Sequence, residues 1–384
     1  MSENQTSQQA VEQAEQKKRR ILSIDALRGL DMFWIIGGEG LFAALFVLTG
    51  WSFWHSLAGQ MTHSVWHGFT VYDLIFPLFI FLSGVSLGLS VKNITKLPGD
   101  QRLSIYKKVL RRLLLLLALG VIYNHGWGTG MPASMDEIRY ASVLGRIGIA
   151  WFIAAMIAWH FSLRTQVIIT VGIALGYWAL LALVSVDGFG GQYTLEHSLN
   201  AWVDQHLLPG ITYQNLPVDP EGLLSSFPAA INAMIGVFVG RMMMAWQDTP
   251  KLLMRNLVSF GVALLIIGWV WDGLMPVNKT LWTSSFAMVT SGCSVLLMAL
   301  FYLLCDVLDW HKFAKPFMVI GVNSIAIYMA SSLINWTYSA TSLFGGLIAG
   351  TPAAWHPLLQ VIALLAMQWW VLYWMYNNKV FVKI

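Results

Sequence analysis

The stretch HSVWHGFTVYDLIFPLFIFLSGVSLGL, residues 63–89, decides the fold of this chain. It begins polar, with two histidines four residues apart, and continues as an apolar run. Thr70 and Asp73 match the capping-box pattern, in which the two side chains satisfy free backbone amides at a helix start. Residues 71–90 would then rise about 30 Å as a helix, the thickness of a bilayer core. The stretch predicts a membrane-spanning helix with a histidine-bearing loop at its N-terminal end.

The composition places the whole chain in the membrane class. Hydrophobic residues make up 57% of it and charged residues 11%, against about 25% charged residues in soluble domains. The 19 Trp and 20 Phe add side chains that gather at membrane interfaces. We therefore predict an all-α polytopic membrane protein with about ten transmembrane helices. The predicted spans are 30–49, 71–90, 109–124, 143–161, 166–185, 223–245, 256–275, 282–305, 317–338 and 357–376.

The distribution of Lys and Arg predicts the topology. Ten spans place both termini on one side, and all but three of the 23 Lys and Arg then fall toward that side. The exceptions are Arg139, Arg146 and Lys279. Because cytoplasmic loops carry the excess of positive charge, we predict that both termini are cytoplasmic. The far side then carries the loops 50–70, 125–142, 186–222, 276–281 and 339–356, with Asp219 starting a helix at the end of the longest one.

The domain organisation is simple. Residues 1–20 are polar, without periodicity, and end in a basic run, which predicts a disordered basic cytoplasmic tail. Residues 21–384 are predicted to form a single transmembrane domain. Cys293 and Cys305 lie about 18 Å apart along one helix and cannot pair. The spacing of His and Cys residues predicts no metal site.

Two residues are candidates for chemistry. His63 lies in the first far-side loop, where an imidazole can act as a general base; the alternative is a loop histidine without a task. Glu39 interrupts the first span within Gly-Gly-Glu-Gly. A carboxylate costs about 3 kcal/mol in such a position and usually marks function, although an interfacial Glu at the span end is the alternative. Asp73 is explained by the capping box alone.

Several cations are candidates for binding an anionic group. Arg146 begins the fourth span, and Lys279 follows Asn278 in a tight turn between two spans. The alternative for both cations is an anchor at the membrane interface. On the cytoplasmic side a basic set could hold phosphates, although the ordinary positive-inside signal explains it as well. That set is Lys107, Lys108, Arg111 and Arg112.

Seven stretches along the chain carry a family resemblance. They are 20–30 (RILSIDALRGL), 63–77, 143–149 (VLGRIGI), 219–224 (DPEGLL), 276–282 (PVNKTLW), 321–328 (GVNSIAIY) and 378–384 (NKVFVKI). In this order they resemble the transmembrane acyltransferases typified by heparan-α-glucosaminide N-acetyltransferase, and particularly their bacterial amino-sugar-operon relatives. The resemblance covers nearly the whole chain.

The resemblance implies an activity and a site. In that family, cytosolic acetyl-CoA donates its acetyl group across the membrane to a glucosamine amine. The family's active-site histidine lies in an H-x-x-W stretch, which here is His63 to Trp66, so the role passes to His63 and not to His67. The family's upstream asparagine has no counterpart here, and we expect Glu39 in its place. Arg146, Asn278, Lys279, Lys108 and Arg112 are then expected to contact CoA or sugar.

The sequence hypothesis is therefore a membrane-embedded, acetyl-CoA-dependent N-acetyltransferase of the bacterial inner (plasma) membrane. His63 is the base or a transient acetyl acceptor, and Glu39 orients it. The expected partners are a small amino sugar or glycan end and the lipid bilayer, with no nucleic acid; a homodimer stays open. The alternatives are a proton-coupled amino-sugar permease using His63 and Glu39 as its relay, and an O-acyltransferase acting on a periplasmic glycan.

Overall fold

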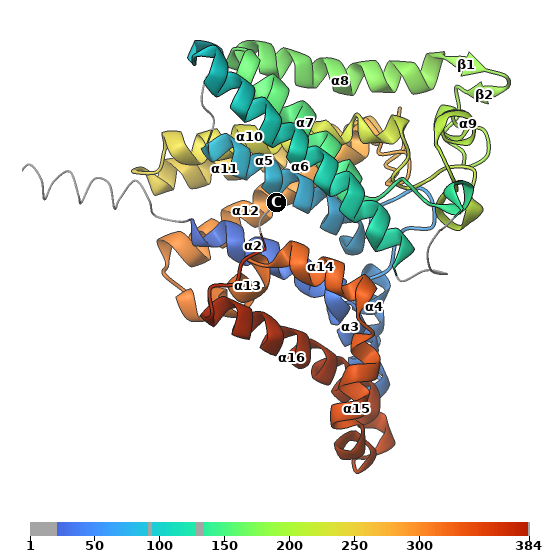
Figure 1. The fold of residues 1–384 in the computed structure, drawn as a ribbon, viewed down its shortest axis with the longest axis vertical. Coiled ribbons are helices and arrows are strands. Elements are labelled where there is room, and N and C mark those ends of the chain that lie inside the picture. The colour runs from blue at the N-terminus through green and yellow to red at the C-terminus, as the bar shows by residue number, and fades with distance from the viewer. Residues whose placement is uncertain (1–20, 91–93, 127–133, 383–384) are drawn as a thin grey trace, which may run out of the picture.

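The structure, a computed structural model, describes residues 21–90, 94–126 and 134–382, so the tail predicted over 1–20 lies outside it. The described part is almost wholly helical (Figure 1). The α-helices are α2 (Leu22–Phe33), α3 (Gly40–Thr49), α4 (Ser52–Gln60), α5 (Ile75–Leu89), α6 (Gly99–His125), α7 (Val143–His160), α8 (Leu163–Leu183), α9 (Leu199–Leu207), α10 (Ala229–Ala245), α11 (Pro250–Asp272), α12 (Ser284–Tyr302), α13 (His311–Gly321), α14 (Ser324–Leu333), α15 (Trp336–Ala349) and α16 (His356–Asn377).

Short elements complete the chain. Strands β1 (Ser185–Val186) and β2 (Phe189–Gly190) pair antiparallel, with Ser185 opposite Gly190. Two π turns, η1 (Trp34–Gly38) and η7 (Leu303–Val307), adjoin helices α2 and α12. The 3₁₀ turns are η2 (Val71–Leu74), η3 (Ile94–Lys96), η4 (Met135–Glu137), η5 (Tyr213–Asn215), η6 (Leu224–Ser226) and η8 (Ala353–Trp355).

The apolar helices confirm a polytopic membrane protein. Within the described ranges, seven straight segments are long and apolar enough to span a bilayer, and two bent pairs raise the number to nine. These nine coincide with nine of the ten predicted spans. The tenth, 109–124, lies within α6, whose 27 residues rise about 40 Å. Basic residues in its first half leave α6 outside the set chosen by apolar composition.

The first predicted span, 30–49, is a broken helix. The chain is already helical at Leu22, and α3 is bent by 56° from the preceding segment. Gly37 allows the break because its φ of +128° is strained for any residue with a side chain. A Cβ at Gly37 would also lie 2.7 Å from a methyl of Leu364. The break leaves Glu39 at the junction between the two helices.

Two details of the predicted loops are wrong. The far-side loop 339–356 is largely helical, because most of α15 lies within it. The side chain of the N-cap residue Asn335 accepts a hydrogen bond from the Tyr338 amide at 2.9 Å and starts this helix. Asp219 does not start a helix, since α10 begins ten residues later. Its carboxylate instead accepts the backbone amides of Tyr213 and Glu221, which fold the segment into a turn.

The centre of the molecule is the contact between α5 and α10. Each helix carries a Gly-x-x-x-Gly pair, Gly84 with Gly88 and Gly236 with Gly240. A Cβ at Gly84 would lie 1.9 Å from the Ala233 carbonyl oxygen of α10. A Cβ at Gly236 would lie 2.1 Å from the Phe81 carbonyl oxygen of α5. Small residues let two membrane helices approach to backbone contact, which is the source of their packing energy. The α5–α10 contact therefore fixes the position of α5, which begins two residues after Asp73.

We predict opposite effects for two glycine substitutions. Gly84→Ala should lower the free energy of unfolding by about 1–3 kcal/mol, because the Ala233 backbone cannot move aside. Gly176→Ala in α8, where a Cβ meets nothing within 4 Å, should be neutral or stabilising by up to about 1 kcal/mol. Thermal unfolding of the purified variants in detergent measures both. Equal destabilisation by the two variants would contradict the packing account.

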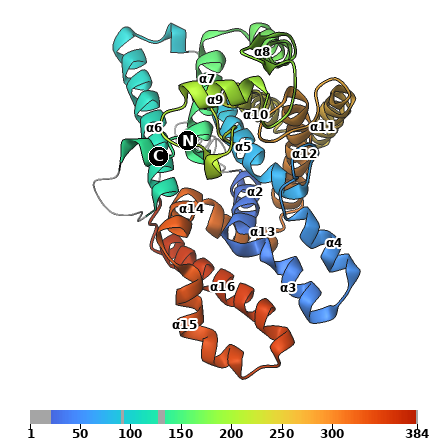
Figure 2. The same ribbon diagram turned by 90° about the vertical axis from the view of Figure 1, so that its right-hand side faces the viewer.

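The contacts between loops support the predicted sidedness. Four of the five loops assigned to the far side are joined to one another, through Trp66 Nε1 to Tyr193 O (2.8 Å), Gly68 N to Val277 O (2.8 Å) and the Arg139–Asp219 ion pair. In Figure 1 the hairpin β1–β2 and α9 lie together at the upper right. Figure 2 shows α14, α15 and α16 grouped on one side of α2, next to α3.

Cysteine labelling tests the topology. In a Cys293→Ala, Cys305→Ala background, cysteines placed at the exposed Ser56 and Gln192 should react with an impermeant maleimide on intact cells. A cysteine at Ser104, in α6, should react only after the cells are opened. Ser198 is fully buried and would be a poor reporter. Labelling of the Ser104 position from outside would overturn the predicted orientation.

Candidate active site

The loop before α5 is fixed by the capping box predicted from the sequence. The Asp73 carboxylate accepts the Thr70 amide at 3.1 Å and lies 3.0 Å from the Thr70 hydroxyl. The Thr70 hydroxyl also reaches the Thr62 carbonyl at 2.7 Å, which closes the loop on itself. Asp73 is fully buried. The capping box therefore folds the loop 62–70 onto the buried Asp73 carboxylate.

The same carboxylate binds His63. His63 Nδ1 lies 2.8 Å from Asp73 Oδ1, and the Ser64 amide donates to Oδ2 at 3.2 Å. Because a carboxylate only accepts, we assign the proton to Nδ1, which leaves Nε2 as a hydrogen-bond acceptor. The His63 side chain is 51% exposed while Asp73 is 0% exposed. The pair is thus a histidine held by a buried acid and open to a reactant on its other side.

Lys279 completes this group from the turn after α11. Its Nζ lies 2.9 Å from both imidazole nitrogens of His63 and 3.7 Å from Asp73 Oδ1. The lone-pair directions of the two ring nitrogens diverge, so an atom equidistant from both is aligned with neither. Burial lowers the pKa of the Lys279 ammonium, and the Asp73 carboxylate opposes this. The sequence prediction that Lys279 belongs to the site is consistent with this placement.

Asn278 holds the two loops of the site together. Its Nδ2 donates to the Trp66 carbonyl at 2.8 Å and its Oδ1 accepts the Leu281 amide at 2.8 Å. Its side chain is fully buried, so its contacts are with the protein and not with a substrate. His67 is near it, with Nδ1 3.4 Å from Asn278 Nδ2, and burial lowers the pKa of His67. Asn278 therefore positions the histidine loop.

Glu39 lies outside this group of contacts. Among the described residues it makes no hydrogen bond to His63, and its Oε2 is buried without a partner. Tyr72 instead lies beside the histidine. The Tyr72 ring packs at 4.7 Å from the His63 ring. The structure thus places Asp73, and not Glu39, in the orienting position beside His63.

Arg146 is enclosed beneath the site. Its guanidinium donates to the Ser225 hydroxyl and lies over the rings of Trp282 (4.7 Å) and Phe76 (5.8 Å). The residue is 1% exposed, and its Nε and Nη1 have no partner in the described part of the chain. In this structure Arg146 cannot touch a substrate directly, so its predicted role in CoA or sugar binding requires access that the structure does not show.

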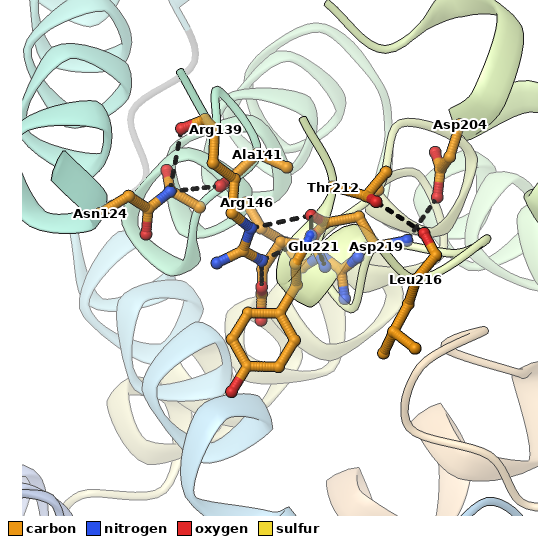
Figure 3. Close-up of polar contacts among 12 residues, drawn as sticks. Asn124, Arg139, Ala141, Arg146, Asp204, Thr212, Leu216, Asp219 and Glu221 are labelled. Atoms are coloured by element: carbon orange, nitrogen blue, oxygen red, sulfur yellow. Dashed lines mark hydrogen bonds and ion pairs between the residues drawn. The ribbon is translucent and has the colours of Figure 1, made fainter. Parts of the chain in front are cut away.

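A second ion cluster closes the longest far-side loop (Figure 3). Arg139 makes a two-pronged ion pair with Asp219, at 2.8 and 2.6 Å, and a further one with Glu221. These acids raise the pKa of Arg139. Asp204 accepts the amides of Asp219 (3.1 Å) and Leu223 (3.0 Å), and burial raises its pKa to about 6. The sequence predicted the longest far-side loop but not these pairings.

Lys108 and Arg112, the two binding candidates on the predicted cytoplasmic side, differ in exposure on α6. Lys108 is exposed, together with Lys107 and Arg111, and lines a shallow hollow of about 380 Å³ on the outer face. Arg112 is less exposed and stacks on Trp151 of α7 at 4.1 Å. The described residues contain no group of three or more His, Cys, Asp or Glu side chains arranged to hold a metal ion.

Comparison with known proteins finds distant relatives. No family model matches the chain. Heparan-alpha-glucosaminide N-acetyltransferase from Mus musculus is 26% identical over 96% of this chain and 62% of its own length. The Homo sapiens protein of that name is 25% identical over 95% and 60%, respectively. The chain thus spans about three fifths of the length of these relatives. It is an integral membrane protein with distant similarity, over nearly its whole length, to heparan-alpha-glucosaminide N-acetyltransferases.

Proposed function

We propose that this protein transfers the acetyl group of acetyl-CoA to the amine of a glucosamine-type sugar at the far side of the membrane. The observation that carries the proposal is the His63–Asp73 pair, 2.8 Å apart, with Lys279 beside it. A histidine held by a buried carboxylate is a general base oriented for proton transfer. The homology to an N-acetyltransferase supports the same reaction class.

The reaction follows from this geometry. The neutral amine attacks the thioester carbonyl carbon, a C–N bond forms, and the carbonyl oxygen becomes an oxyanion. His63 Nε2 takes the proton that the nitrogen loses, while the Asp73 carboxylate stabilises the resulting imidazolium. The intermediate then collapses, the C–S bond breaks, and the thiolate of CoA leaves with a proton from His63. Holding both reactants beside His63 supplies much of the rate, because it removes the entropic cost of their encounter.

Lys279 is suited to the oxyanion. Its ammonium is mostly buried, with a side-chain exposure of 16%, and its charge there interacts more strongly than in water. We assign Glu39 no direct role in the proton transfer, because among the described residues it makes no hydrogen bond to His63 and its Oε2 is buried.

Two alternatives share the same residues. In the first, His63 attacks the thioester itself and carries the acetyl group to the amine. In the second, a hydroxyl of a periplasmic glycan replaces the amine as acceptor. A proton-coupled permease is disfavoured, because the relay expected of it needs contact between His63 and Glu39, and the described residues show none.

Substitution of the histidines tests the assignment. His63→Ala should lower acetyl transfer to glucosamine by about 10²–10⁴-fold, because the base is lost. Asp73→Asn should lower it comparably, since an amide no longer fixes the Nδ1–H tautomer. His67→Ala is the matched control and should be mild. The measurement is turnover in liposomes, with CoA affinity measured alongside; near-wild-type turnover by His63→Ala would refute the proposal.

The pH dependence of the rate tests Lys279. A lowered pKa means that Lys279 loses its proton below the ordinary lysine value of 10.5, so the rate should fall on the alkaline side at correspondingly lower pH. Lys279→Arg keeps its charge and should shift this fall to higher pH, whereas Lys279→Met should lose about 10²–10³-fold below the fall and should not show the fall itself. The measurement is kcat/KM against pH with one acceptor. An unchanged alkaline fall in Lys279→Arg would assign it to another group.

A further inference from the structure

Trp282 has a backbone conformation that residues with a side chain rarely adopt. Its φ is +50°, in the left-handed region, and it lies two residues before α12. The Trp282 amide donates to the Lys279 carbonyl at 3.1 Å, so the two residues close one tight turn. A left-handed tryptophan persists only where its surroundings hold it, and such positions gather at functional sites. The shape of the turn that carries Lys279 therefore depends on what holds the Trp282 side chain.

The Trp282 side chain is held by a buried hydrogen bond to Asn232 of α10. Both residues are fully buried, and the indole Nε1 donates to Asn232 Oδ1 at 3.0 Å. Asn232 Nδ2 points toward α12, where it lies 3.0 Å from the Thr290 hydroxyl and 2.9 Å from the Ser291 hydroxyl. Because an indole N–H only donates, it determines which end of the Asn232 amide faces Trp282. Asn232 thus fixes the indole between α10 and α12.

The Trp282 ring connects the two halves of the candidate site. It packs edge-to-face against Phe76 at 5.1 Å, and Phe76 follows Asp73 by three residues at the start of α5. The Arg146 guanidinium lies over the same ring at 4.7 Å. The side chain of Trp282 therefore contacts the helix start that binds His63, while its backbone closes the turn that carries Lys279.

We propose that Asn232 and Trp282 are positioning residues that hold Lys279 against His63, an inference that rests on the proposed acetyl transfer. Lys279 Nζ lies 2.9 Å from His63 Nε2, a distance that the shape of the turn maintains. Without Asn232 the indole N–H is unpaired in a buried environment, and the left-handed backbone loses part of its support. The turn then relaxes and the ammonium moves away from the imidazole. Asn232 and Trp282 are both fully buried, so they act through Lys279 and not on a reactant.

Ser294 provides a matched control in the same helix as the partners of Asn232. It is fully buried in α12, and its hydroxyl donates to the Thr290 carbonyl at 2.7 Å. It lies 12 residues after Trp282, and none of the hydrogen bonds among the described residues joins it to the indole. Ser294→Ala therefore removes one buried hydrogen bond without disturbing the turn.

A double-mutant cycle tests the positioning role. The measurement is kcat/KM for acetyl transfer to glucosamine in liposomes, with Lys279→Met placed in the wild type and in each variant. Lys279→Met should cost about 10²–10³-fold in the wild type. It should cost less than about tenfold in Asn232→Leu, where the ammonium is already displaced. Trp282→Phe keeps a ring but loses the indole N–H, so it should behave like Asn232→Leu, whereas Ser294→Ala should keep the full cost of Lys279→Met.

Thiol labelling tests the same geometry without turnover. Lys279→Cys is made in the Cys293→Ala, Cys305→Ala background, and its reaction with an impermeant maleimide is timed on the purified full chain. The Lys279 side chain is only 16% exposed, so the cysteine should react slowly. Adding Asn232→Leu or Trp282→Phe should speed the reaction, because the turn opens, and adding Ser294→Ala should not.

Other results overturn the proposal. If Lys279→Met costs the same factor in Asn232→Leu and Trp282→Phe as in the wild type, the two residues only support the fold. Equal labelling rates in all backgrounds would show that the turn keeps its shape without them. Either result, with acetyl transfer intact, would refute the positioning role alone. A wild type without acetyl transfer would instead refute the proposed function, and with it any catalytic task for the turn.

Discussion

The buried carboxylate of Asp73 links the fold of this protein to its candidate chemistry. One oxygen closes the capping box with Thr70 and accepts the Ser64 amide, and the other binds His63 Nδ1. A buried carboxylate is tolerated only when its oxygens are hydrogen-bonded, so the helix start and the histidine loop each satisfy part of that requirement. The loop cannot move without leaving the carboxylate unsatisfied. The position of His63 is therefore coupled to the start of α5, and through the glycine contacts of α5 to the centre of the bundle.

The sequence predicted the classes of element better than their interactions. Apolar length located nine spans, because a bilayer imposes nearly the same length on every helix that crosses it. The predicted capping box is present, but it does not fully explain Asp73, which contacts His63 where the sequence predicted Glu39. A capping carboxylate has two oxygens, and only the fold shows what the second one contacts. Similarly, four basic residues on α6 look alike in sequence, yet the helix turns only Arg112 toward Trp151.

The far-side ion pairs show what fixed charges contribute here. Arg139 is matched by Asp219 and Glu221, whereas the buried Arg146 makes one hydrogen bond and otherwise lies against aromatic rings. A buried charge of this kind is seldom a source of stability, because desolvation offsets the attraction. The Arg146 charge instead contributes to the electrostatic potential inside the bundle. Lys279, whose Nζ lies 2.9 Å from His63 Nε2, brings a further positive charge to the candidate site, where the proposed reaction would develop an oxyanion.

The backbone contact between α5 and α10 fixes the depth of the histidine loop. The proposed transfer, with a cytosolic donor and a far-side acceptor, needs the reacting thioester to lie at the depth of His63. A loop alone could not hold that depth, but a helix in backbone contact with α10 at Gly84 and Gly88 can. Gly84 lies in the second half of α5 and Gly88 in its last turn, so the closest packing anchors the end of the helix farther from Asp73. A change that loosens the α5–α10 contact should therefore alter the alignment of thioester and His63 before it alters the binding of either substrate.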